Sequence, residues 1–242
     1  MPSHTIVTRD EWLEARRAHL AREREFTRRR DQLSAERRAM PRVKVDKPYV
    51  FERAEGKATL ADLFDRRRQL IVYRFMFGPG WEEGCPSCSF LADHIDGAVV
   101  HLAQRNVTLL AVSRAPLRQI EAFKRRMGWR FPWVSSYGND FNRDYHVSFT
   151  KEEKAKGAVF YNFDRREFRS EDAPGISVFY KDEYGEVFHN SSYAHGLDLL
   201  VGAYNYLDLA PKGRDEDALA FTMAWVRHHD RDGHRAGSRS ER

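Results

Sequence analysis

The chain has 242 residues, of which 41% are hydrophobic and 13% aromatic, enough to bury one substantial core. No window approaches the roughly 18 consecutive apolar residues of a membrane span, and the first residues lack the apolar stretch of a secretory signal. These features argue against a membrane-spanning protein, and we expect a cytoplasmic one.

The net charge of +5 is carried by the two ends of the chain. Residues 1–42 have a net charge of +4 and residues 227–242 of +2, so the remaining body is close to neutral. No basic strand with interleaved aromatic residues appears. This distribution is typical of a solvated helix and a basic tail around a neutral core, and it argues against nucleic-acid binding.

The first segment predicts one long helix over residues 9–39, opened by a capping box of Thr8 and Glu11. Its apolar stripe repeats every seven residues, at Trp12, His19, Phe26 and Leu33. Charged residues beside the stripe keep it narrow, which argues against a strong two-stranded coiled coil. We expect an arm that packs on its own domain or on a second subunit, and we favour a homodimer.

After Pro41 the pattern becomes that of an α/β protein. We expect extended chain at 43–52, a short helix at 58–67, buried strands at 70–77 and 107–113, a helix at 87–104, and a further helix from Pro116 to Gly128. This order predicts a βαβ unit with a parallel pair of strands. The cysteines then lie at the carboxyl end of a strand, where open α/β sheets place their chemistry.

The chain's two cysteines, Cys85 and Cys88, have C-x-x-C spacing. A reducing cytosol disfavours a structural disulfide, so the pair is interpreted as catalytic, redox-sensing or metal-binding. We expect Cys85 near the N-cap of a helix, Pro86 at its first position and Cys88 at its third. Unpaired amides at this helix end stabilise a thiolate, whereas Glu82 and Glu83 oppose it. The residues alone leave the pKa of Cys85 on either side of neutrality.

One helical turn also brings the second sulfur within bridging distance, so the pair can close into a disulfide and reopen. In this hypothesis Cys85 attacks and Cys88, deeper in the helix, resolves.

The sequence around the dithiol resembles the thioredoxin superfamily. Pro174 begins PGISVFYKDEYGEV, which resembles the cis-proline strand and hairpin that face the cysteines of thioredoxins, and residues 131–147 resemble a segment of peroxiredoxin-type proteins. Together, GPGWEEGCPSCSFLAD, AVSRAP, RMGWRFPWVSSYG and YLDLAPKGRDED resemble a bacterial family catalogued as domain of unknown function 899. That resemblance covers nearly the whole chain, and the family is described as thioredoxin-like or as dithiol-disulfide oxidoreductases.

The resemblance implies a thioredoxin-like α/β fold with a central mixed sheet and flanking helices. To this fold are added the long N-terminal helix, a peroxiredoxin-like insertion and a helical C-terminal extension. The implied organisation is an N-terminal arm at 1–42, a thioredoxin-like domain at 43–230 and a disordered basic tail at 231–242.

The implied activity is thiol-disulfide exchange through Cys85 and Cys88 with a protein or small-molecule disulfide or thiol, without a cofactor. The supporting residues are Trp81, Pro86, Ser87 and Pro174. We expect Pro174 close to Cys85, in a strand next to that of residues 70–77, with a cis peptide bond.

The chain departs from the better-known relatives at several positions. Trp81 stands four residues before Cys85, and proline takes the second position of the motif, as in glutaredoxin-like C-P-x-C sites. Gly78 and Glu82 replace the proline and the threonine or serine that peroxiredoxins need before the attacking cysteine. The resemblance therefore does not extend to a general thioredoxin or to peroxidase activity of that type.

Two other interpretations of the cysteines stay open. In the first, the chain is a binding protein without redox turnover, in which the cysteines hold copper or zinc with His94 or present a surface to a partner. Alternatively, they are buried and inert thiols.

Three further segments are interpreted as structural. Trp129, Phe131 and Trp133 are core or pocket wall. His228 and His229 form an exposed pair, and residues 146–157 are a surface connection without chemistry.

Overall fold

The computed structural model describes residues 5–193 and 197–232. The chain divides into two compact units, residues 1–42 and 43–242. Most of the basic tail expected at 231–242 lies outside the described residues. Within them, no helix combines the length and the apolar character that crossing a membrane requires.

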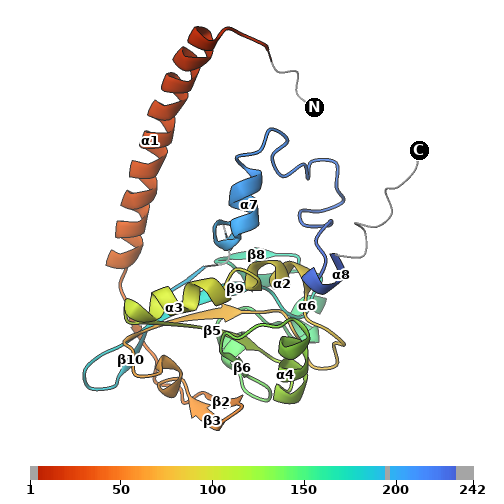
Figure 1. The fold of residues 1–242 in the computed structure, drawn as a ribbon. Helices are drawn as coiled ribbons and strands as arrows, with labels where there is room; N and C mark the ends of the chain where they lie inside the picture. The colour runs from red at the N-terminus through yellow and green to blue at the C-terminus, as the bar shows by residue number, and fades with distance from the viewer. Residues whose placement is uncertain (1–4, 194–196, 233–242) are drawn as a thin grey trace. The chain divides into compact units, whose positions relative to one another are not determined.

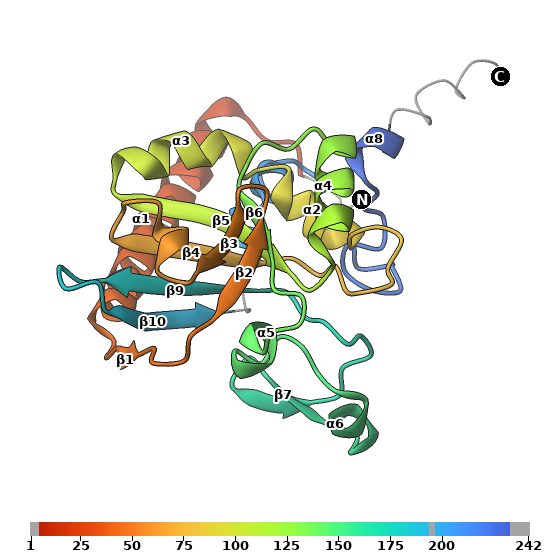
Figure 2. The same cartoon turned by 90° about the horizontal axis from the view of Figure 1, so that it is seen from below.

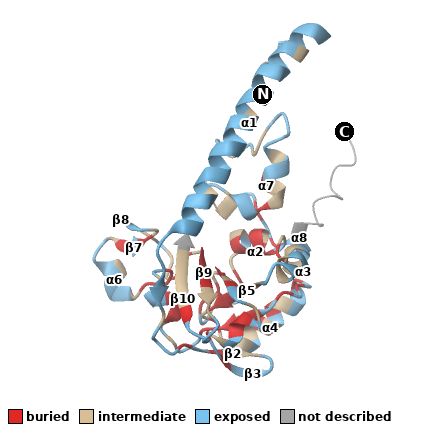
Figure 3. Ribbon diagram, turned by 90° about the vertical axis from the view of Figure 1, so that its left-hand side faces the viewer, coloured by how far each residue is buried: buried red, intermediate tan, exposed pale blue. Residues whose placement is uncertain are grey.

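The first unit is the helix α1, Arg9–Ala39, which confirms the predicted element. Its capping box is complete, because the Thr8 hydroxyl accepts from the amide of Glu11 at 3.4 Å and the Glu11 carboxylate accepts from the amide of Thr8 at 2.8 Å. None of its residues is buried (Figure 3). The apolar stripe is half-exposed or more at Trp12, Phe26 and Leu33, and its partner stays a prediction.

The second unit is built on a mixed sheet of eight strands (Figures 1 and 2). In spatial order these are β1 (Val43–Lys44), β10 (Val187–Tyr193), β9 (Gly175–Lys181), β4 (Gln69–Arg74), β5 (Val107–Ser113), β6 (Trp133–Ser135), β2 (Val50–Arg53) and β3 (Gly56–Thr59). Strands β4, β5 and β6 are parallel, which confirms the predicted βαβ rhythm. Strand β9, which follows Pro174, lies next to β4 as expected, and the two strands are antiparallel.

Helices cover one face of this sheet. They are α2 (Pro86–Ala92), α3 (Asp96–Gln104) and α4 (Leu117–Arg126). Along β4, Tyr73 faces these helices and packs in one core cluster with Cys88 and Phe123. Its neighbour Val72 points to the opposite face, where a second cluster includes Phe64 of the short helix η1 (Asp62–Phe64).

Two predicted helices differ from the structure. The segment 87–104 is two helices rather than one, because tertiary hydrogen bonds hold its middle. There the Asp93 carboxylate accepts from the indole of Trp129 at 2.8 Å, and the Asp96 carboxylate accepts from the amide of Phe131 at 2.7 Å. At 58–67 the helix is a single turn, because Thr59 belongs to β3 and Asp65 adopts a left-handed conformation that ends it.

Between β6 and β9 the chain forms an insertion, residues 136–174 (Figure 2). It contains α5 (Phe141–Asp144), α6 (Lys151–Ala155) and a hairpin of β7 (Val159–Tyr161) and β8 (Asp164–Arg166). A third apolar cluster forms here around Val147, Phe149 and Tyr161. The interpretation of 146–157 as a surface connection is therefore wrong for Val147 and Phe149, which are buried, whereas α6 has no buried residue.

The C-terminal extension is helical in part. It comprises η2 (Leu197–Leu200), α7 (Gly202–Leu207) and α8 (His229–Asp232), joined by turns. Tyr204 of α7 is fully buried in the core cluster that contains Cys88, and its ring packs edge-to-face on that of Phe90 in α2 at 5.3 Å. These contacts fix the extension to the domain.

Candidate active site

The cysteines lie where the chain passes from β4 to α2. The amide of Cys85 donates to the carbonyl of Met76 at 3.0 Å, which ties the motif to the end of the strand. Cys85 is the N-cap of α2, Pro86 is its first residue and Cys88 its third, as predicted. The Ser89 amide and hydroxyl both donate to the Cys85 carbonyl, at 2.9 and 3.0 Å, and close this first turn.

The sulfur of Cys85 is surrounded by hydrogen-bond donors. The Cys88 thiol is the strongest, and the amides of Cys88 and Ser87 and the Ser87 hydroxyl add to it. Burial opposes them, but together the donors lower the pKa of Cys85 to about 6. The pKa of Cys85, which the sequence left on either side of neutrality, is thus lowered below it.

Cys88 has the opposite environment. Its side chain is 3% exposed. The hydrogen bond that it donates to Cys85 raises its pKa well above the ordinary value, and burial and the charge on Cys85 add to this. The buried Tyr73 hydroxyl donates to the Cys88 carbonyl at 3.2 Å and fixes this turn of the helix. The pair is therefore one half-buried thiolate in front of one buried thiol.

Glu83, one of the two glutamates beside the motif, is held in ion pairs with arginines. Glu83 pairs with Arg126 at 2.8 Å and receives two hydrogen bonds from Arg231, at 2.8 and 3.0 Å. The hydrogen bond from Arg126 is the largest of several causes that lower the pKa of Glu83. Because two arginines neutralise this carboxylate, its field at Cys85 is weak.

His228 is a residue of the site that sequence reasoning missed. It was expected in an exposed pair, but it is 2% exposed. Its Nε2 lies 2.9 Å from the carbonyl of Gly84, the residue before Cys85, and donates to it, since a carbonyl only accepts. Its ring packs edge-to-face on Phe123 at 5.4 Å.

No local pattern marks His228, because its partner lies 144 positions away. Its neighbour His229 is less covered, with its side chain 44% exposed, and contacts Asp93 at 2.6 Å. The C-terminal extension therefore holds the loop that carries Cys85.

Pro174 lies at the same edge of the sheet as the cysteines. It directly precedes β9, whose first residue, Gly175, pairs with the last residue of β4, Arg74. The Pro174 carbonyl accepts from the Tyr161 hydroxyl at 2.7 Å. Burial, and after it the charge of Cys88, raise the pKa of this tyrosine.

The prediction of a cis bond at Pro174 is wrong, because its peptide bond is trans. The reason lies in the preceding residues. The amide of Ala173 donates to Val147 at 2.9 Å, and Asp172 pairs antiparallel with Ser148. This ladder leads the chain into β9 already extended, and a trans bond continues it.

Trp81 and His94 take different positions. Trp81 is partly buried against the core cluster that contains Cys88, in the loop before the dithiol. His94 points to the C-terminal extension, where its Nε2 accepts from the amide of Ala203 at 3.4 Å. No group of three or more His, Cys, Asp or Glu side chains suited to a metal is found in the described part of the chain.

Trp129, Phe131 and Trp133 are buried in the same core cluster, as expected of core residues. Their rings lie 5.5–6.0 Å apart from centre to centre. The Trp133 indole donates to the Ser113 hydroxyl at 3.0 Å, which satisfies its polar atom.

The mixed sheet, the βαβ unit and the dithiol at the start of a helix define a protein with a thioredoxin-like fold. The chain belongs to the family described as bacterial protein of unknown function (DUF899), whose sequence profile matches residues 1–232. No curated protein matches the chain.

Solved structures of similar fold include the following two. Peroxidoxin BcpB from Mycobacterium tuberculosis is 13% identical, with 68% of this chain and 93% of that one covered and a TM-score of 0.44. Peroxiredoxin Q from Xanthomonas campestris is 15% identical, with 65% and 89% covered and a TM-score of 0.41. Similarity at this level says nothing about activity.

Proposed function

We propose that this protein is a thiol-disulfide oxidoreductase in which Cys85 is the nucleophile and Cys88 the resolving thiol. The observation that carries the proposal is the asymmetry of the pair. Hydrogen bonds lower the pKa of Cys85 to about 6, while Cys88 lies buried and protonated one turn behind it. The thiolate is the attacking form of cysteine, so only Cys85 is ready to react at neutral pH.

The reaction follows from this arrangement. The Cys85 thiolate attacks one sulfur of a substrate disulfide, the substrate S–S bond breaks, and the first substrate thiolate leaves. A mixed disulfide now joins Cys85 to the substrate. Cys88 then loses its proton to solvent or to the departing thiolate and attacks the Cys85 sulfur, which releases the second substrate thiol. The substrate gains two electrons, and the protein is left with a Cys85–Cys88 disulfide.

The two steps are linked through the same hydrogen bond. While Cys85 is a thiolate, it holds the Cys88 proton and keeps that sulfur inert. Once Cys85 is bonded to substrate, its negative charge is gone and the Cys88 thiol loses the acceptor that raised its pKa. Resolution is thereby favoured only after attack. A second thiol or dithiol must reduce the protein again for turnover.

The low pKa of Cys85 also raises the reduction potential of the Cys85–Cys88 disulfide. A stabilised thiolate favours the reduced pair, so its disulfide is more easily reduced than one between two ordinary thiols. The same site can therefore pass oxidising equivalents to a substrate dithiol by the reverse steps.

The test is to trap the intermediate. In Cys88→Ser the mixed disulfide on Cys85 cannot resolve, so it should accumulate and appear as a covalent adduct that a reductant releases. Cys85→Ser should trap nothing, and both variants should lose turnover in a disulfide-reduction assay. Equilibration of the wild type in glutathione buffers should give a single intramolecular disulfide with a measurable potential.

Three results would contradict the proposal. These are equal and slow alkylation of both cysteines, no intramolecular disulfide in oxidising glutathione, and a stoichiometric metal that copurifies with the protein. The last would favour a thioredoxin-fold metal-binding protein instead.

A further inference from the structure

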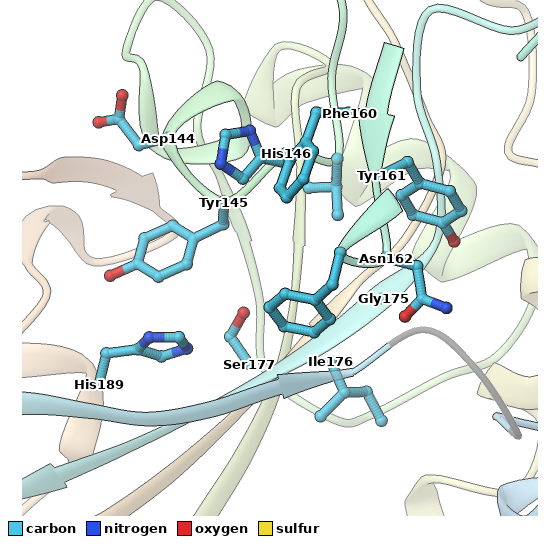
Figure 4. A pocket seen from close by; sticks show the side chains of 12 residues that line it. Asp144, Tyr145, His146, Phe160, Tyr161, Asn162, Gly175, Ile176, Ser177 and His189 are labelled. Carbon is cyan, nitrogen blue, oxygen red and sulfur yellow. The ribbon is translucent and has the colours of Figure 1, made fainter. Parts of the chain in front are cut away.

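A cavity of about 230 Å³ lies between the insertion and the sheet (Figure 4). Its walls come from the end of α5, the β7–β8 turn, the start of β9 and His189 of β10. Most of the surface is apolar and aromatic, from Tyr145, Phe160, Tyr161 and Phe163. Cavities of this kind, with a few polar groups, are the usual form of small-molecule sites.

A buried charge lies directly behind one wall of the cavity. Arg74, in β4, is 1% exposed. Its guanidinium donates to the hydroxyl of Ser177 at 3.1 Å and lies 4.7 Å from the ring centre of Tyr145, and both of these residues line the cavity. Burial lowers the pKa of Arg74 to about 9, so the group is still charged at neutral pH.

This charge has no anionic partner among the described residues. Arg74 makes its other contacts with the carbonyl of Phe141 at 3.4 Å and with that residue's ring at 4.0 Å, and its Nε has no hydrogen-bond partner. A charge held in the interior without a counter-ion is costly. An anion in the cavity would supply one.

The one carboxylate of the cavity wall is engaged elsewhere. Asp144 accepts from Lys47 and from the hydroxyl of Tyr49, both at 2.6 Å. In Figure 4 its oxygens point away from the other labelled side chains. Burial and the charge of Arg74 lower the pKa of His189, which is therefore neutral at pH 7. The guanidinium thus dominates the field in the cavity.

The backbone at the opposite wall breaks a local rule. Asn162 and Phe163 form the two-residue turn between β7 and β8, and both have positive φ, 53° and 63°. Glycine is the usual second residue of such a turn, because a bulky side chain is strained there. The second residue of this turn is instead Phe163, which is 73% exposed and lines the cavity. Strain retained without gain in packing points to a binding role.

From these observations we propose that the cavity binds a small planar carboxylate, an aromatic or conjugated acid. Its ring lies among the aromatic walls with Phe163, and its carboxylate faces Ser177 and the charge of Arg74. For an anion roughly 6 Å from a guanidinium at an effective dielectric constant of about 20, the attraction is worth about a hundredfold in affinity before screening. We expect at least a tenfold preference for the anion.

Calorimetry on the full chain tests this with three matched probes, 2-naphthoate, its neutral amide 2-naphthamide, and the cation 2-naphthylmethylamine. Naphthoate should bind with a dissociation constant below 1 mM, the amide at least tenfold more weakly, and the amine not at all. The double variant Cys85→Ser, Cys88→Ser serves as the background, so that the result does not depend on redox chemistry. Equal binding of acid and amide, or no binding of naphthoate at 5 mM, would overturn the proposal.

Two variants separate binding from folding. Phe163→Gly should relieve the strained turn, so it should unfold at the same or a higher temperature and yet bind naphthoate at least threefold more weakly. Ser177→Asp should give Arg74 an internal carboxylate and abolish naphthoate binding, while circular dichroism still reports the native fold. The control is Tyr184→Ala, which removes an aromatic ring that is 84% exposed and outside the cavity. Unchanged affinity in both test variants would refute the proposed site.

Discussion

Because the pKa of Cys85 is low, we expect its reactivity to exceed that of an ordinary thiol most strongly at acidic pH. At pH 5.5 a thiol with a pKa of about 6 is roughly one quarter ionised, whereas an ordinary thiol with a pKa of about 8.5 is ionised to about 0.1%. The thiolate advantage is thus about 240-fold. A weaker base is also a weaker nucleophile, and a Brønsted coefficient of about 0.45 over 2.5 pKa units removes about 13-fold. Cys85 should then react about 18 times faster than glutathione at pH 5.5, but only about twice as fast at pH 7.

The assay is the rate of iodoacetamide labelling of each cysteine, followed by mass spectrometry from pH 4.5 to 9. The Cys85 rate should rise to a plateau with a midpoint near pH 6, and Cys88 should stay unlabelled through neutrality because its pKa is raised. A midpoint above 8 for Cys85, or earlier labelling of Cys88, would refute the electrostatic account of the site.

Two substitutions isolate the largest cause. Cys88→Ser keeps an O–H donor beside Cys85 and should leave the midpoint near 6. Cys88→Ala removes the donor, and a hydrogen bond to a charged group is worth about 1.5–3 kcal/mol, which is roughly one to two pH units. The midpoint should rise by that amount in the alanine variant alone. Equal midpoints in the two variants would show that the donor is elsewhere.

Further predictions concern stability and assembly. Because the pKa of Cys85 is lower in the folded than in the unfolded chain, its thiolate stabilises the reduced fold above the unfolded pKa, and this is lost as pH falls toward 6. The free energy of unfolding, measured with urea, should therefore rise by up to about 1.4 kcal/mol per pH unit between 6 and 8.5, and Cys85→Ser should remove this slope. Gly84→Ala should cost about 1–3 kcal/mol, since its Cβ would lie 2.5 Å from the Phe75 ring, whereas Gly97→Ala in α3, with nothing within 4 Å, should not destabilise. His228→Phe should cost about 1–3 kcal/mol by leaving the Gly84 carbonyl without its donor, and His229→Phe less. Light scattering should give a dimer for the wild type and a monomer for Phe26→Glu with Leu33→Glu, and a wild-type monomer would contradict the role given to the α1 stripe.

Features set by neighbouring residues were predictable from the sequence. The capping box of Thr8 and Glu11 needs residues three apart, and the placement of Cys85, Pro86 and Cys88 in the first turn needs only the start of a helix. The parallel pair β4 and β5 followed from two buried runs with a helical stretch between them.

Features set by distant residues were not predictable. Glu83, next to the motif, is paired with two arginines that lie 43 and 148 positions away. A count of the charges near the motif includes this glutamate but neither of the two arginines that pair with it. The cis bond at Pro174 was inferred from resemblance, and the ladder with Val147 that keeps the chain extended belongs to the insertion.

Arg74 shows a further limit of pattern reading. The run from 70 to 77 was interpreted as a buried, almost entirely apolar strand, and the single arginine inside it was given no role. Alternation along β4 places Arg74 on the same face as Leu70 and Val72, where its charge is surrounded by aromatic rings and one hydroxyl. An apolar residue of similar size would fill that space without the cost of burying a charge. Arg74 therefore breaks the apolar pattern of its strand, and the fold gives its charge no ion-pair partner among the described residues. A bound ligand is the physical explanation for such a position.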